Sequence, residues 1–146
     1  MTLEEELVTF DLYLGSTMEA ISKYQPSVKS SELRADSASL YSVLSGTERE
    51  TVTYLTETYD FDRADDTLVE NENLHKDELE QDLFRAKITG ILDRIFAHKM
   101  AYEISMIQSK ESAIYDKVTD EAYKSAIESS YNSLETLYSK FNDFSE

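Results

Sequence analysis

The chain has 146 residues, a formal net charge of −16 and no cysteine. The lack of cysteine excludes disulfide bonds, thiolate zinc sites and cysteine nucleophiles. The acidity disfavours direct contact with DNA, RNA or anionic lipid, because basic side chains supply affinity for phosphate. With only three glycines and one proline, turns are few. We expect an all-α fold: a four- or five-helix bundle with two long C-terminal helices forming an antiparallel hairpin, and residues 1–146 as a single helical domain.

The first expected helix is amphipathic and ends at Gln25-Pro26, because the residue before a proline disfavours the helical conformation. Its stripe recurs at steps of three and four and consists of Leu3, Leu7, Phe10, Leu14, Thr17, Ile21 and Tyr24. Acidic residues follow Met1 where a signal peptide would need basic ones. We therefore expect a cytoplasmic protein, or one carried in an assembled viral particle.

Residues 27–59 favour two shorter helices. Segment 27–45 is rich in serine, which has weak helix propensity, but three leucines still mark a stripe. We expect Gly46 to end this helix. Thr47, with Glu50 three residues later, matches a capping box that would begin the next helix.

The acidity is concentrated between Glu57 and Asp82, where eleven acidic residues face only two basic ones. We expect residues 60–73 to form a loop or a poorly formed helix. Three interpretations stay open: a solvated loop, a docking patch for a protein partner with a basic surface, and a divalent-cation site. The candidate patch consists of Asp60, Asp62, Asp65, Asp66, Glu70, Glu72, Asp77 and Glu78.

Metal-ligand patterns in this region are incomplete. An EF-hand loop starting at Asp60 fails at its sixth and twelfth positions, which are Asp65 and Asn71. Glu72 and His75 form one Glu-x-x-His pair, which is half of the pattern found in di-metal carboxylate bundles. We assign no metal ligand and no cofactor.

The longest helical pattern runs from Leu79 to Ile114, with Gly90 as its one weak point. We predict a continuous helix whose buried stripe is Phe84, Ile88, Ile91, Ile95, His98, Tyr102 and Met106. On this stripe, His98 would be a hydrogen-bonded histidine in a core or interface rather than a ligand.

A break near Val118–Asp120 should precede the last helix, with Thr119 or Asp120 as its cap. Its heptad stripe is Tyr123, Ile127, Ser130, Leu134, Leu137, Phe141 and Phe144. Adjacent tyrosines widen the stripe, which predicts either partner docking or a core tyrosine pair. We assign the helix interface to Tyr123, Ile127, Tyr131, Leu134, Tyr138 and Phe141.

No catalytic signature is present: the chain lacks a phosphate-binding glycine loop and a nucleophile elbow. We expect a non-enzymatic acidic protein that acts through protein–protein interaction in a structural or adaptor role, without direct nucleic-acid or membrane contact. A homo-oligomer is one option for this interaction. One alternative is an inhibitor of the phage or mobile-element type, which mimics nucleic-acid charge to block a nucleic-acid-binding protein. A second is a metal-binding helical bundle.

Overall fold

The computed structural model describes the backbone of residues 1–59 and 66–146, and the side chains of residues 1–59 and 69–146. The described chain is helical throughout apart from short connections. Its elements are α1 (Leu3–Tyr24), the 3-10 turn η1 (Gln25–Ser27), α2 (Ser31–Thr58), α3 (Asp66–Ile88), α4 (Leu92–Lys117) and α5 (Glu121–Ser145).

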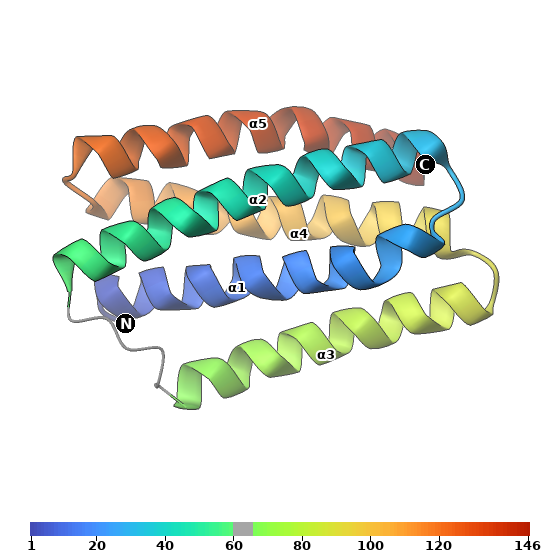
Figure 1. The fold of residues 1–146 in the computed structure, drawn as a ribbon, viewed down its shortest axis with the longest axis horizontal. Coiled ribbons are helices and arrows are strands. Elements are labelled where there is room, and N and C mark those ends of the chain that lie inside the picture. Colours follow the sequence, from blue (N-terminus) through green and yellow to red (C-terminus); the bar gives the residue numbers. More distant parts are fainter. Residues whose placement is uncertain (60–65) are drawn as a thin grey trace.

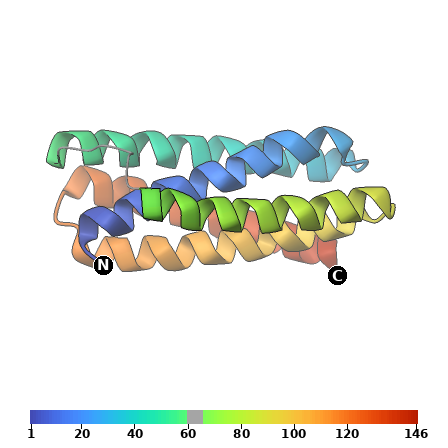
Figure 2. The same ribbon diagram turned by 90° about the horizontal axis from the view of Figure 1, so that it is seen from below.

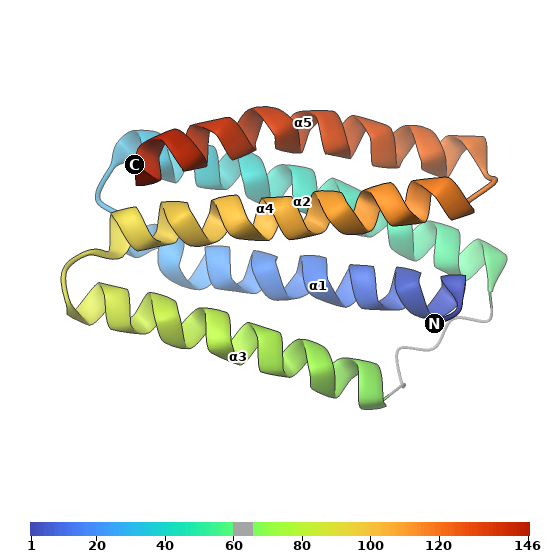
Figure 3. The ribbon, with the colours of Figure 1, turned by 180° about the vertical axis from the view of Figure 1, so that it is seen from behind.

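Four helices (α1, α2, α4 and α5) form an antiparallel bundle, and α3 lies outside it (Figure 1). α1 packs on α2 and α4, and α5 packs on α2 and α4, so these four enclose one core. α3 packs chiefly against α1 and α4 (Figures 2 and 3). α4 and α5 form the expected C-terminal hairpin, and the all-α bundle is confirmed.

α1 follows the predicted pattern. Thr2 caps it in a reciprocal capping box with Glu5, and the helix ends at Tyr24, directly before Gln25-Pro26. The predicted stripe is buried except at Leu3, which is half-buried. Each large apolar side chain that leaves water here contributes about 1.5–3 kcal/mol, so this stripe fixes the helix in the core.

The predicted break in the second segment is wrong. α2 continues through Gly46 to Thr58, because its leucine stripe is buried on both sides of the glycine: Leu33, Leu40, Leu44 and Leu55. Thr47 caps no helix. Its hydroxyl donates to the Val43 carbonyl at 2.9 Å and to Ser130 Oγ at 2.8 Å, which ties α2 to α5.

The predicted continuous helix from Leu79 to Ile114 is also wrong. Gly90 has a φ of +77°, a conformation that favours glycine, and the chain reverses there between α3 and α4. Because the chain turns at Gly90, the residues of α4 that face the core do not continue the stripe of α3. The buried residues of α3 that contact the bundle include Leu79, Leu83 and Ala86, and those of α4 include Phe96, Met100, Ile104, Ile107 and Ile114.

The stripe predicted for that helix is therefore mostly on the outside. Phe84 is 55%, Ile88 67%, Ile91 46% and Tyr102 55% exposed. His98 is exposed as well, which corrects its expected place in a core or interface. Residues 66–73, expected to form a loop or a poor helix, belong to α3.

α5 confirms its predicted start and stripe. Asp120 Oδ1 accepts a hydrogen bond from the Tyr123 amide at 2.8 Å and caps the helix. The heptad residues are buried from Tyr123 to Phe141, and Phe144 is half-buried. In the described part of the chain, no helix has the length and apolar character needed to cross a bilayer.

Candidate functional sites

The predicted acidic patch lies only partly within the described residues. Four of its side chains are outside the described set: Asp60, Asp62, Asp65 and Asp66. Glu70, Asp77 and Glu78 are exposed on α3, whereas Glu72 is buried against the bundle. Docking of a basic partner stays a prediction, and α3 offers it three solvent-facing carboxylates.

The predicted helix interface of α5 packs mainly inside the molecule. Four of its six residues are buried: Tyr123, Ile127, Leu134 and Phe141. The Tyr123 ring stacks on Tyr54 of α2 with centroids 4.7 Å apart, and its hydroxyl lies 2.8 Å from Thr51 Oγ1. Tyr138 is half-buried and Tyr131 is 37% exposed. Use of this face by a partner stays a prediction, and Tyr131 is the residue most open to one.

A buried polar group, which we call the histidine cluster, joins three helices. It consists of Tyr13 (α1), Glu72 and His75 (α3), and Glu103 (α4). The Tyr13 hydroxyl donates to Glu103 Oε2, and His75 Nε2 lies 3.0 Å from the same oxygen. The Tyr13 and His75 rings stack with centroids 4.2 Å apart. The cluster is a polar contact that helps to hold α3 on the bundle.

The charges in the histidine cluster depend on one another. Burial alone would lower the pKa of His75, but the hydrogen bond and charge of Glu103 outweigh it and raise that pKa. Burial raises the pKa of Glu72, and the charges of His75 and Lys110 partly oppose this. Both groups therefore favour their protonated forms more than free side chains do. Their stabilising contribution is present at low pH and is lost as the pH rises through the raised pKa values.

The sequence pattern pointed to half of this cluster. The Glu72-x-x-His75 spacing does place both side chains on one face, with 3.7 Å between His75 Nδ1 and Glu72 Oε2. The parts that were missed are Tyr13 and Glu103. The sequence feature that could have indicated the cluster is Glu103, an acid that lies between Met100 and Ile107 on the apolar stripe of α4. Among the described residues, no three His, Asp or Glu side chains are arranged to hold a metal ion.

A second acid, Glu111, is buried deeper in the bundle. It is 0% exposed, and neither carboxylate oxygen has a hydrogen-bond partner within the described residues. Burial raises its pKa to about 8, and the Ser130 hydroxyl opposes this only in part. Glu111 therefore favours its neutral, protonated form more strongly than an exposed glutamate does.

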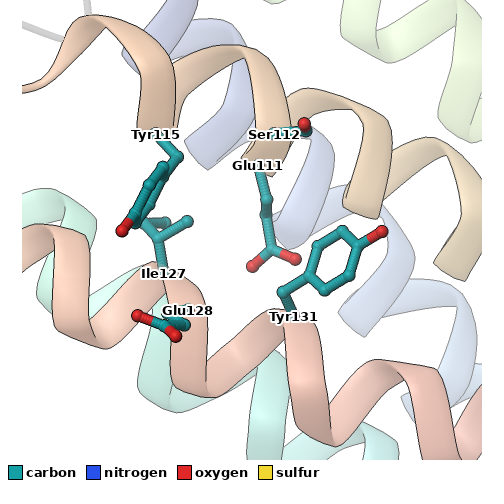
Figure 4. Close-up of a pocket in the computed structure, with 6 residues that line it drawn as sticks. All are labelled: Glu111, Ser112, Tyr115, Ile127, Glu128 and Tyr131. Atoms are coloured by element: carbon teal, nitrogen blue, oxygen red, sulfur yellow. The ribbon is translucent and has the colours of Figure 1, made fainter.

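Glu111 lines a cavity of about 250 Å³ between α4 and α5 (Figure 4). The other lining residues are Ser112, Tyr115, Ile127, Glu128 and Tyr131. In Figure 4 the carboxylate points from α4 toward α5 and lies beside the Tyr131 ring. Sequence reasoning missed this site too, although Glu111 stands between Ile107 and Ile114 on the same core stripe.

The outward face of α3 is a third candidate site, which we call the α3 outer face. Residues at steps of three and four share one side of a helix, and here they are Leu74, Asp77, Gln81, Phe84 and Ile88, with Glu78 and Arg85 at the margin. Leu74 is 61% exposed, so with Phe84 and Ile88 three large apolar side chains on this face contact water. Clusters of this kind mark interaction sites more often than isolated exposed residues do.

Charge is unevenly distributed along the same helix. All seven acids of α3 precede Leu83, and its last turn carries Arg85 and Lys87. The helix is thus acidic at one end and basic at the other, with apolar side chains at Leu74 and at Phe84 and Ile88.

Comparison of the chain with protein-family models, with curated proteins and with solved structures found no match.

Proposed function

We propose that this chain is a non-enzymatic interaction protein that pairs with a second copy of itself through the α3 outer face. The observation that carries the proposal is the exposure of Leu74, Phe84 and Ile88 on one face of a helix. Burial of such side chains at a contact would contribute about 25 cal/mol for each Å² removed from water.

The charge pattern favours an antiparallel pair. In a two-fold contact centred on Gln81, Leu74 of one copy meets Ile88 of the other, and Asp77 meets Arg85. Each such contact occurs twice, as symmetry requires. Asp77 and Glu78 of each α3 then lie against the basic last turn of its partner, although each chain is strongly acidic as a whole. A parallel pair would instead place like charges side by side.

Sedimentation velocity over a concentration series tests the pairing. We expect a reversible dimer that Ile88→Ser weakens, with Tyr41→Ser as the matched control, because Tyr41 is exposed on α2, away from α3. A chain that stays monomeric at the highest soluble concentration would refute the proposal.

A charge-reversal cycle tests the register. Asp77→Lys alone and Arg85→Glu alone each place like charges together and should weaken the dimer by about tenfold. The double variant restores opposite charges at both contacts and should recover most of the affinity. If the double variant is as weak as the single variants, the antiparallel register centred on Gln81 is wrong.

A further inference from the structure

The cavity beside Glu111 brings a buried carboxyl and two tyrosine rings together. Its volume of about 250 Å³ has room for roughly eight water molecules and therefore for a small organic group. Glu111 lines it with a carboxyl that is 0% exposed, and the Tyr115 and Tyr131 rings lie on either side (Figure 4). Glu128 is exposed at the opening.

Among the described residues, neither oxygen of the Glu111 carboxyl has the hydrogen-bond partner that buried acids normally have. Leaving such a group without a hydrogen bond costs about 1–3 kcal/mol, and both of its oxygens are in this position. The nearby Ser130 hydroxyl, which lies 2.8 Å from Thr47 Oγ1, lowers the pKa of Glu111 by less than burial raises it. A ligand with a hydrogen-bond donor would therefore find an acceptor in the Glu111 carboxyl that the protein itself leaves largely unused.

The surroundings of Glu111 contain acids, phenols and hydroxyls, and one ammonium group. The titratable groups are Asp11 on α1, Tyr115 on α4, and Tyr123, Lys124, Glu128 and Tyr131 on α5. The α2 side offers the hydroxyls of Thr47 and Thr51, bonded to Ser130 and Tyr123. A cationic donor would be attracted to this site, and an anion would be repelled.

We propose that this cavity binds a primary ammonium group, with Glu111 as its counter-ion and the Tyr115 and Tyr131 rings around its alkyl chain. Tyrosine faces attract cations, and the neighbouring Lys124 ammonium already lies 4.5 Å from the centroid of the Tyr115 ring. Entry requires the Tyr131 side chain, which is 37% exposed, to swing outward. The site is independent of the α3 outer face.

The probe for this proposal is n-butylammonium, titrated into the isotope-labelled full chain and followed by NMR. We expect saturable shifts at Glu111, Tyr115 and Tyr131, and none with n-butanol, which has a similar shape but no charge. Binding needs the ionised carboxylate, so below pH 8 the affinity should increase about tenfold for each unit by which the pH is raised. The titration midpoint of the Glu111 side-chain carboxyl carbon should fall when the amine is present.

Two variants separate this site from general attraction to an acidic protein. Glu111→Gln keeps the shape and should abolish saturable binding. Asp116→Asn removes one exposed charge from the same helix and should leave binding unchanged. Equal binding to Glu111→Gln, or equal binding of butanol, would overturn the proposal. So would a Glu111 midpoint that does not move in the wild-type chain.

A second ligand distinguishes the source of the ammonium group. Nα-acetyl-lysine methylamide carries the same group on a peptide-like backbone. If it binds more tightly than butylammonium, the ligand is a lysine side chain of another protein; if it binds more weakly, the ligand is a free amine. If neither ligand shifts the cavity resonances at pH 8, the proposal is wrong.

Discussion

Glu103 and Glu111 lie eight residues apart on α4, and both are buried in the same bundle, yet their surroundings differ. Glu103 Oε2 accepts a hydrogen bond from the Tyr13 hydroxyl and lies 3.0 Å from His75 Nε2. Neither oxygen of Glu111 has a hydrogen-bond partner in the described part of the chain, and burial raises its pKa to about 8. Burial alone therefore does not decide what an acid does in this core. The partners decide whether it links helices or remains a buried acid with a raised pKa.

The largest expected effect comes from replacing the acid that has no partner. Glu111→Met keeps a similar volume and removes the buried polar group, so the free energy of unfolding should rise by about 1–3 kcal/mol at pH 5. In the wild-type chain the unfolded Glu111 ionises above pH 4.5 while the folded one stays protonated up to about 8. Wild-type stability therefore falls with rising pH, and the gain from the variant should grow by roughly 3 kcal/mol by pH 8.

Urea unfolding at several pH values measures this gain. Asp116→Ala, an exposed change on the same helix, should stay within about 0.5 kcal/mol of the wild type at each pH. A Glu111→Met chain that is less stable than the wild type at pH 8 would show that the carboxyl has partners in the folded state.

The acid that has partners should respond in the opposite direction. Glu103→Ala leaves the Tyr13 hydroxyl and His75 without their shared acceptor, so the free energy of unfolding should fall by about 3 kcal/mol. Because α3 shares this contact, hydrogen exchange of the α3 amides should accelerate more than that of the α5 amides. Equal acceleration in both helices would mean that the cluster stabilises the whole bundle rather than the attachment of α3.

Much of the fold was predictable because it rests on local patterns. The stripes of α1 and α5, the stop at Pro26 and the Asp120 cap all follow from spacing and from backbone chemistry. The errors occurred where tertiary packing overrides a local signal. Gly46 is tolerated inside α2 because leucines on both sides are buried, whereas Gly90 adopts a positive φ and turns the chain.

The candidate sites were harder to predict for a related reason. Moving the helix break to Gly90 changes which side of α3 and α4 faces inward, so residues predicted to be buried became the α3 outer face. Tyr13 and Glu103 are 90 residues apart in the chain, and nothing in local spacing shows that they meet. An acid within a core stripe, as at Glu103 and Glu111, was the one available indication.

A smaller effect is expected from removing only one hydrogen bond of the histidine cluster. Tyr13→Phe keeps the ring stacked on His75 and deletes the hydroxyl, so the free energy of unfolding should fall by about 1.5–3 kcal/mol, as for hydrogen bonds to charged groups. Tyr131→Phe is the matched control, because that side chain is 37% exposed, and it should change stability by less than about 0.5 kcal/mol. Equal losses in the two variants would argue against a special contact at Glu103.

The smallest effect is a shift in a titration midpoint. NMR should show His75 titrating above the ordinary value of 6.5, because Glu103 and Glu72 stabilise its charged form against the opposing effect of burial. Glu103→Gln removes the larger of these two contributions and should lower the midpoint, whereas Asp77→Asn, an exposed change two residues away on α3, should leave it nearly unchanged. If Glu103→Gln leaves the midpoint in place, Glu103 does not control the charge of His75. The contrast between the two buried acids would then reflect packing alone, since the partners of Glu103 would have no electrostatic consequence.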